Sequence, residues 1–167
     1  MKKNIFLSLI IAAALMAGGN AFAAGVAYVD VAEVFDNYQK TKDQDLAMKN
    51  IGEQKEKERA ALVKAARALE DEMSLLAKEA RQPKQEQLIE KKRQLEDFDR
   101  EVRRQLGESR EKVVREIFQD IDTTIAEYGK AKGYDFILND RVLLYRNPTL
   151  NITKDILQEL MKKYKKA

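Results

Sequence analysis

The sequence predicts a mainly α-helical protein in which a long antiparallel helical hairpin, a coiled-coil arm, is attached to a small body of short β-strands that serves for oligomerisation. Three observations predict this fold class. Residues 31–132 are almost all strong helix formers, with one break at 81–84. Apolar runs rich in β-branched and aromatic residues lie on both sides of that stretch. The 167 residues include no cysteine, so stability depends on packing and not on disulfide bonds.

The first 23 residues have the pattern of a secretory signal peptide. Two lysines precede an apolar run, Ile5–Ala17, that is shorter than the roughly 20 residues of a membrane-spanning helix. Small residues occupy the −3 and −1 positions of a cut after Ala23. We therefore expect export, removal of residues 1–23, and a mature protein that is soluble in the periplasm.

The composition argues against an enzyme and against nucleic-acid binding. Lysine and arginine number 31 against 28 acidic residues, and the predicted cut removes two of the bases, so the mature chain is nearly neutral. Nucleic-acid binders usually carry a strongly basic stripe. Histidine and cysteine, the commonest general base and the best nucleophile and zinc ligand, are absent. We expect no enzymatic activity, no catalytic or metal-binding residues, no cofactor and no nucleic-acid partner.

The body is expected to begin with residues 24–30. Val26–Val29 is a β-branched and aromatic run that predicts one buried strand, and Asp30 then offers a helix N-cap.

Residues 31–132 are expected to form the hairpin arm, with its tip near 81–84. Proline fits the first turn of a helix but not its interior, so Pro83 is predicted to open the second helix. Each helix of nearly 50 residues would be about 75 Å long. Reflection of the sequence about residue 82 pairs apolar residues of the two helices, such as Leu69 with Leu95, whose numbers add to 164.

The middle of this hairpin is predicted to be weak. The same reflection brings Lys55 opposite Ser109 and Glu58 opposite Leu106. Gly107 adds to the weakness, since a glycine inside a helix costs about 1 kcal/mol relative to alanine. We expect the arm to be flexible there.

Residues 133–167 are expected to complete the body. Gly133 is a predicted helix C-cap, and the apolar runs Tyr134–Leu138 and Val142–Tyr145, separated by a turn-forming segment, predict a β-hairpin. Thr153 is the predicted N-cap of a final helix. The expected buried face of that helix consists of Ile156, Leu157, Leu160 and Met161.

The body is predicted to be shared between subunits. Three short strands and one helix, about 50 residues, bury too little surface to anchor such an arm alone. The strands are also apolar on both faces, which predicts a homo-oligomer with cyclic symmetry. The expected oligomer interface consists of Val26, Tyr28, Phe136, Leu138 and Leu144.

Both ends of the mature chain resemble the Skp (OmpH-like) family. The resemblance rests on Val26–Asp30 after a signal peptide, on residues 134–145, on Asn151-Ile152-Thr153 with its closing helix, and on the order of these elements around a charged hairpin. It extends over essentially the whole mature chain. One departure is Asn151, where the family pattern leads us to expect an aspartate before the Ile-Thr pair.

The resemblance implies a jellyfish-shaped homotrimer whose helical arms enclose a cavity. It also implies an ATP-independent periplasmic holdase chaperone that takes part in outer-membrane protein biogenesis by binding unfolded outer-membrane β-barrel proteins. Strands of such proteins carry apolar faces and unpaired backbone edges, so they aggregate in water. The alternative function is a structural coiled-coil adaptor of a periplasmic envelope complex, which would favour a rigid, regular seam.

Two basic segments leave alternatives open. The tip residues Lys78, Arg81 and Lys84 either bind acidic clients or anionic lipid, or belong to an ordinary solvated helix end. The lysines within 162–166 either complement the dipole of the last helix or make weak contact with anionic lipid or lipopolysaccharide.

Overall fold

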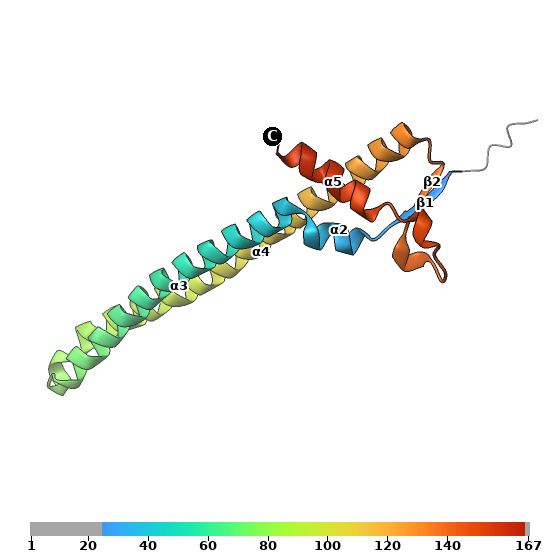
Figure 1. Cartoon of the computed structure of the whole chain (residues 1–167). Helices are drawn as coiled ribbons and strands as arrows, with labels where there is room; N and C mark the ends of the chain where they lie inside the picture. Colours follow the sequence, from blue (N-terminus) through green and yellow to red (C-terminus); the bar gives the residue numbers. More distant parts are fainter. Residues whose placement is uncertain (1–24, 166–167) are drawn as a thin grey trace, which may run out of the picture.

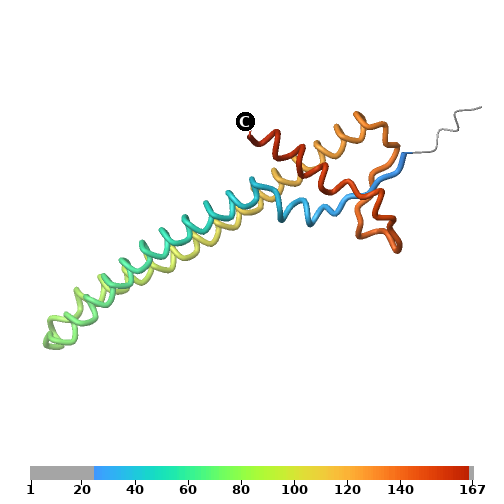
Figure 2. Tube along the Cα trace, in the orientation of Figure 1, coloured from blue at the N-terminus to red at the C-terminus, as the bar shows by residue number. Residues whose placement is uncertain are grey.

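The computed structural model describes residues 25–165, so the predicted signal peptide and its cut after Ala23 lie outside the described part. A long arm of two helices, α3 and α4, extends from a small body that contains two strands and both ends of the described part of the chain (Figures 1 and 2). This arrangement confirms the predicted class of a helical hairpin on a short-stranded body. The elements in chain order are β1 (Val26–Val29), α2 (Val31–Asn37), α3 (Gln39–Ser74), α4 (Gln82–Lys132), β2 (Phe136–Asn139) and α5 (Thr153–Tyr164).

The first helical stretch is divided at Tyr38. Asp30 caps α2, because its side chain accepts a hydrogen bond of 2.8 Å from the Glu33 backbone N–H. The backbone at Tyr38 is extended (φ −65°, ψ 130°), so α2 and α3 are separate helices and not the single helix predicted from residue 31. The Tyr38 side chain is buried in the body, and this packing outweighs the helix propensity of its neighbours.

The connection at the tip begins earlier than predicted. α3 ends at Ser74 and not near residue 81, and residues 75–81 form the turn, with a 3-10 segment at Lys78–Ala80. α4 begins at Gln82 with Pro83 in its first turn, as predicted for this proline. Part of the first predicted helical stretch is therefore used for the turn.

The register of the hairpin is displaced accordingly. The ion pairs between α3 and α4 join residues whose numbers add to between 156 and 162, where the predicted pairing requires 164. The midpoints of these pairs therefore lie at residues 78–81, one to four residues before residue 82. These ion pairs are Arg59–Asp99 at 2.9 Å, Glu72–Lys84 at 2.6 Å and Glu70–Lys92 at 2.9 Å.

The two strands form a parallel pair, with Val26 opposite Phe136 and Tyr28 opposite Leu138. On its other side β1 forms a bridge at Tyr28 with Asn151. The predicted β-hairpin of 134–138 with 142–145 is wrong, because β2 pairs with β1. Within the described residues, 142–145 form no strand, and Val142 is the last residue of a 3-10 turn, Asp140–Val142.

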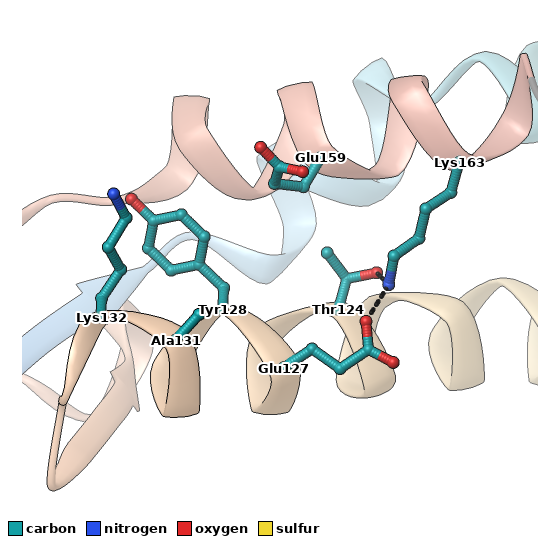
Figure 3. Close-up of a pocket in the computed structure, with 7 residues that line it drawn as sticks. All are labelled: Thr124, Glu127, Tyr128, Ala131, Lys132, Glu159 and Lys163. Atoms are coloured by element: carbon teal, nitrogen blue, oxygen red, sulfur yellow. Dashed lines mark hydrogen bonds and ion pairs between the residues drawn. The ribbon is translucent and has the colours of Figure 1, made fainter.

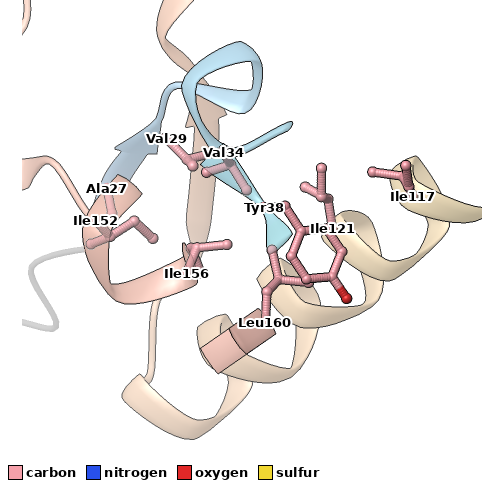
Figure 4. Packing of buried hydrophobic residues seen from close by; sticks show 9 residues of the cluster. All are labelled: Ala27, Val29, Val34, Tyr38, Ile117, Ile121, Ile152, Ile156 and Leu160. Atoms are coloured by element: carbon pink, nitrogen blue, oxygen red, sulfur yellow. The ribbon is translucent and has the colours of Figure 1, made fainter. Parts of the chain in front are cut away.

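The hydrophobic core lies where β1, α2 and α5 meet the last third of α4 (Figure 4). The nine fully buried members are Ala27, Val29, Val34, Tyr38, Ile117, Ile121, Ile152, Ile156 and Leu160. α5 contributes Ile156 and Leu160 to this core, as predicted for its apolar face.

The start of α5 differs from the prediction, because Thr153 is the first helical residue and not the N-cap. Its hydroxyl accepts a hydrogen bond from the Asp30 backbone N–H (2.9 Å). The Asn151 side chain accepts one from the Thr153 N–H (2.9 Å). Asn151 thus performs the acceptor role expected of an aspartate at this position.

Candidate functional site

A set of exposed apolar side chains lies on the strands of the body and on residues 142–150, and we name it the body apolar surface. In a strand, alternate residues point to opposite faces, so Ala27 and Val29 enter the core while Val26, Phe136 and Leu138 lie on the other face of the pair. On that second face Phe136 is 61% exposed. The whole surface consists of Val26, Phe136, Leu138, Val142, Leu144, Tyr145 and Leu150. Apolar side chains left exposed in such numbers point to an interaction site.

Four of the five predicted interface residues belong to this surface, and Tyr28 does not. Tyr28 is only 5% exposed, because the Arg146 guanidinium lies 5.9 Å above its ring. Arg146 is held there by an ion pair with Asp140. Tyr28 is therefore covered by its own chain. The additional members Val142, Tyr145 and Leu150 were missed, because residues 142–145 were assigned to a strand and Leu150 follows Pro148, where the strand was expected to have ended.

The seam of the arm contains a hollow of about 200 Å³ at the level of Lys55. Lys55 occupies a seam position but turns to Glu58 (2.8 Å), with its ammonium group 5.8 Å from the centre of the Phe98 ring. The hollow is lined by Ile51, Lys55, Val102, Gln105, Leu106 and Ser109. Lys55 and Ser109, which the sequence analysis expected to face each other, both line this hollow, and the weakness and flexibility of the arm there stay predictions.

Two helical glycines lie near this hollow. Gly52 on α3 and Gly107 on α4 have numbers that add to 159, within the range of the hairpin's ion pairs, so they lie at the same level of the arm. Apart from the neighbouring backbone of its own helix, nothing lies within 4 Å of the place where a Cβ would be at either position. Packing therefore does not require glycine here, and both residues weaken the helices.

The three basic residues proposed for the tip have different surroundings. Lys84 pairs with Glu72 at 2.6 Å, and the Arg81 Nε donates to the Leu76 carbonyl at 2.9 Å. Both therefore help to hold the turn together. Lys78 has no ion-pair partner among residues 25–165. Beside it Leu75 is 87% exposed, an apolar feature of the tip that the sequence analysis missed.

The exposed face of α4 carries a ladder of ion pairs between residues three or four positions apart. The best-connected member is Arg104, which bonds to Glu101 and Glu108. Hydrogen bonds from Arg104 and Gln105 lower the pKa of Glu101 to about 2. The charged side chains of this ladder are therefore paired with one another within α4.

The joint between arm and body is held by aromatic and charged side chains. Tyr38 and Tyr164 pack edge to face with ring centres 5.8 Å apart. Tyr164 donates to Asp43 of α3 at 2.9 Å, and Lys40 pairs with Asp120 of α4 at 2.8 Å. Burial and the neighbouring Asp120 raise the pKa of Tyr38 to about 12. The joint was missed because its residues lie far apart in the sequence.

A hollow of about 280 Å³ separates α4 from α5 at this end of the molecule. Figure 3 shows Lys163 reaching across it to Thr124 (3.0 Å) and Glu127 (2.6 Å). Lys162 likewise pairs with Glu159 at 2.7 Å. These two lysines of the basic C-terminus therefore have partners within the chain, so the hollow has no surplus of positive charge with which to hold an anion. Among residues 25–165 there is also no cluster of potential metal ligands.

Comparisons with known proteins agree with this architecture. The profile of the family described as outer membrane protein (OmpH-like) matches residues 25–160. A solved structure of a Caulobacter crescentus protein described as an OmpH-like outer membrane chaperone is similar with a TM-score of 0.71. The two are 19% identical over 87% of this chain and 88% of that chain, so this likeness shows the fold alone. No curated protein matches the chain. None of the helices within 25–165 has the length and hydropathy required to cross a membrane. The family match extends over most of the chain, and the chain therefore belongs to the OmpH-like outer membrane protein family.

Proposed function

We propose that the protein is a periplasmic holdase that binds unfolded outer-membrane β-barrel proteins between helical arms without ATP. The observation that carries the proposal is the body apolar surface at one end of a long arm. A second copy seated on this surface would bury it and would place the arms of the copies around a common space. Because no cofactor or catalysis is needed for such binding, we propose no enzymatic activity.

The proposed oligomer is a trimer held by the body. Cyclic symmetry lets each copy use one part of its apolar surface against a different part of its neighbour. Among the described elements β2 pairs only with β1, so its second edge is free to take an additional strand. The fully exposed Leu144 (108%) lies in an adjacent apolar segment with the composition of a strand.

Client binding is proposed to consist of many weak contacts along the arm. Exposed apolar side chains are distributed singly over it and not in one patch, and they are Leu46, Ile51, Leu75, Ile89 and Phe118. Several weak contacts to one client act together through their high effective concentration. Folding of the client buries its apolar surface, so release needs no nucleotide.

Export and cleavage after Ala23 belong to the same proposal, because outer-membrane proteins must cross the periplasm before they fold in their membrane. The tip residues Lys78, Arg81 and Lys84 are proposed as weak electrostatic contacts to clients. Since Arg81 and Lys84 also hold the turn, Lys78→Gln is the clean test of a charge contribution. Its effect on client affinity should disappear at high salt, where the Debye length falls to about 3 Å.

The adaptor function has one observation in its favour, the ion-pair ladder that stiffens α4. The hollow at Lys55 argues against it, because a rigid spacer requires a filled seam.

The test is an aggregation assay with a urea-denatured porin diluted into buffer without nucleotide. Light scattering should stay low when the chaperone is present at one trimer per client. Unrestrained aggregation at every salt concentration and every ratio would remove the holdase proposal and leave the adaptor.

A further inference from the structure

Helix α5 connects the core of the body with both helices of the arm. Its apolar face lies in the core. In its last turn, two adjacent residues bind two different helices of the arm. Lys163 bonds to Glu127 of α4 at 2.6 Å, and Tyr164 donates a hydrogen bond to Asp43 of α3 at 2.9 Å. The last turn of α5 therefore ties the root of α3 to α4.

The two helices of the arm enter the body in different ways. α4 runs without a break from the tip into the core, as one helix from Gln82 to Lys132. α3 is separated from α2 by Tyr38, whose backbone is extended (φ −65°, ψ 130°). Residues between two elements are the positions that absorb hinge motions. α4 is therefore the continuous support of the arm, and α3 can move at its root about Tyr38.

Bending of the arm requires its two helices to slide past each other. Because packed helix axes lie about 8–10 Å apart, a bend of about 15° in the plane of the two helices slides one along the other by about 2–3 Å. Lys163 fastens the end of α5 to α4, so this slide carries Asp43 away from Tyr164. A hydrogen bond between a hydroxyl and a carboxylate oxygen spans only about 2.5–3.0 Å, so this bond breaks when the arm bends.

Tyr164 restrains α3 more tightly than the second contact at this root, the ion pair of Lys40 with Asp120 at 2.8 Å. The ammonium group of a lysine lies at the end of a flexible chain and can follow a displaced partner. The rigid ring of Tyr164 packs edge to face on Tyr38 with ring centres 5.8 Å apart. Helix ends open more easily than helix centres, so Tyr164 can detach while the rest of α5 stays in the core.

We infer that Tyr164 and Asp43 form a latch that sets the angle of the arm. While the latch is closed, α3 is held at its root, and when it opens the arm bends about Tyr38. Opening needs no ligand, since it is a local opening at the end of a helix. The inference deepens the proposed function, because an arm that bends changes the space offered to a client, and for that consequence it rests on the proposed function.

The experiment measures the distance between two spin labels by pulsed electron paramagnetic resonance. The chain has no cysteine, so the labels attach only at Lys57→Cys on α3 and Lys154→Cys on α5, both at exposed positions. Labelled protein is refolded with an excess of unlabelled protein, so that an oligomer carries at most one labelled copy. We expect one narrow distance distribution for this chain, and a distribution about twice as wide when Tyr164→Phe or Asp43→Ala is added.

Two matched controls separate the latch from general loosening. Tyr128→Phe removes a bond of the same kind, from a tyrosine hydroxyl to Asp155 at 3.1 Å, but this bond joins α4 to α5 and does not involve α3. Asp45→Ala removes an exposed carboxylate of α3 two residues from the latch. Both controls should leave the distance distribution unchanged. Circular dichroism verifies the fold of every variant before it is labelled.

Amide hydrogen exchange gives a second measurement on the unlabelled protein. Amides of residues 43–47 should exchange about fivefold faster in Tyr164→Phe, the change expected for loss of one hydrogen bond, and at an unchanged rate in Tyr128→Phe. Unchanged distances and exchange in both latch variants would overturn the inference, and so would equal broadening in Tyr128→Phe. Neither measurement uses a client, so a failure of the latch is distinguishable from a failure of the proposed holdase function in the aggregation assay.

Discussion

Replacement of Lys55 by leucine should stabilise and stiffen the arm. Lys55 lies at a seam position with its side chain 31% exposed, beside a hollow of about 200 Å³. Full burial of a leucine side chain contributes about 1.5–3 kcal/mol, and partial exposure reduces this. Loss of the exposed pair with Glu58 costs only about 0.2–0.5 kcal/mol. The net expected gain is about 1–2 kcal/mol for Lys55→Leu.

Amide hydrogen exchange with mass spectrometry is the direct assay, because it reports local opening of the arm separately from the body. Amides around residue 55 on α3 and around residue 106 on α4 should exchange about tenfold more slowly in Lys55→Leu. The matched control is Lys57→Leu, which places the same side chain at an exposed position of the same helix and should leave exchange unchanged. Equal or faster exchange in Lys55→Leu would refute the reasoning that the hollow makes the arm weak.

The remaining predictions concern the body, the glycines and the joint. Phe136→Asp should dissociate the oligomer, because an unpaired buried charge costs several kcal/mol, whereas Leu46→Asp on the exposed arm should leave the mass measured by light scattering unchanged. Gly107→Ala should raise stability by about 0.5–1 kcal/mol in thermal melts, and Gly25→Ala should lower it, because its Cβ would lie 2.8 Å from a backbone carbonyl. The pKa of Tyr38 is raised from 10.0 to about 12 in the folded chain. The stabilisation that depends on its protonated hydroxyl is therefore complete below pH 10 and is lost as the pH rises to 12. Tyr38→Phe should therefore unfold with a smaller dependence on pH between these values, and an identical dependence would show that Tyr38 does not couple folding to pH.

Local chemistry explains why much of the arm could be predicted from the sequence. Helix propensity without an internal proline identifies long helices, and Pro83 marks the start of α4 because its missing N–H is tolerated only there. The polar seam position at Lys55 is visible from the spacing of apolar residues. The shift in register was not visible, since no residue between Leu75 and Arg81 ends a helix by its own chemistry.

The errors in the body have a different cause, which is long-range pairing. Residues 134–138 and 142–145 look like a hairpin locally, but β2 pairs with β1 across more than 100 residues. The break at Tyr38 is likewise set by its contact with Tyr164 at the far end of the chain. Four of the five residues predicted for the oligomer interface are exposed in the folded chain, and the interface itself stays a prediction. The cover over Tyr28 was not visible in the sequence, because only folding brings Arg146 over its ring.

We propose that an oligomer of this chain holds an unfolded β-barrel protein between its arms without an energy source. The decisive measurement is native mass spectrometry of the purified protein, mixed with a urea-denatured porin and diluted into nucleotide-free buffer. We expect a complex of three copies with one unfolded porin, and we expect Phe136→Asp to abolish this complex. If the porin aggregates and only the mass of the chain without porin is detected, the protein is not a holdase of this kind.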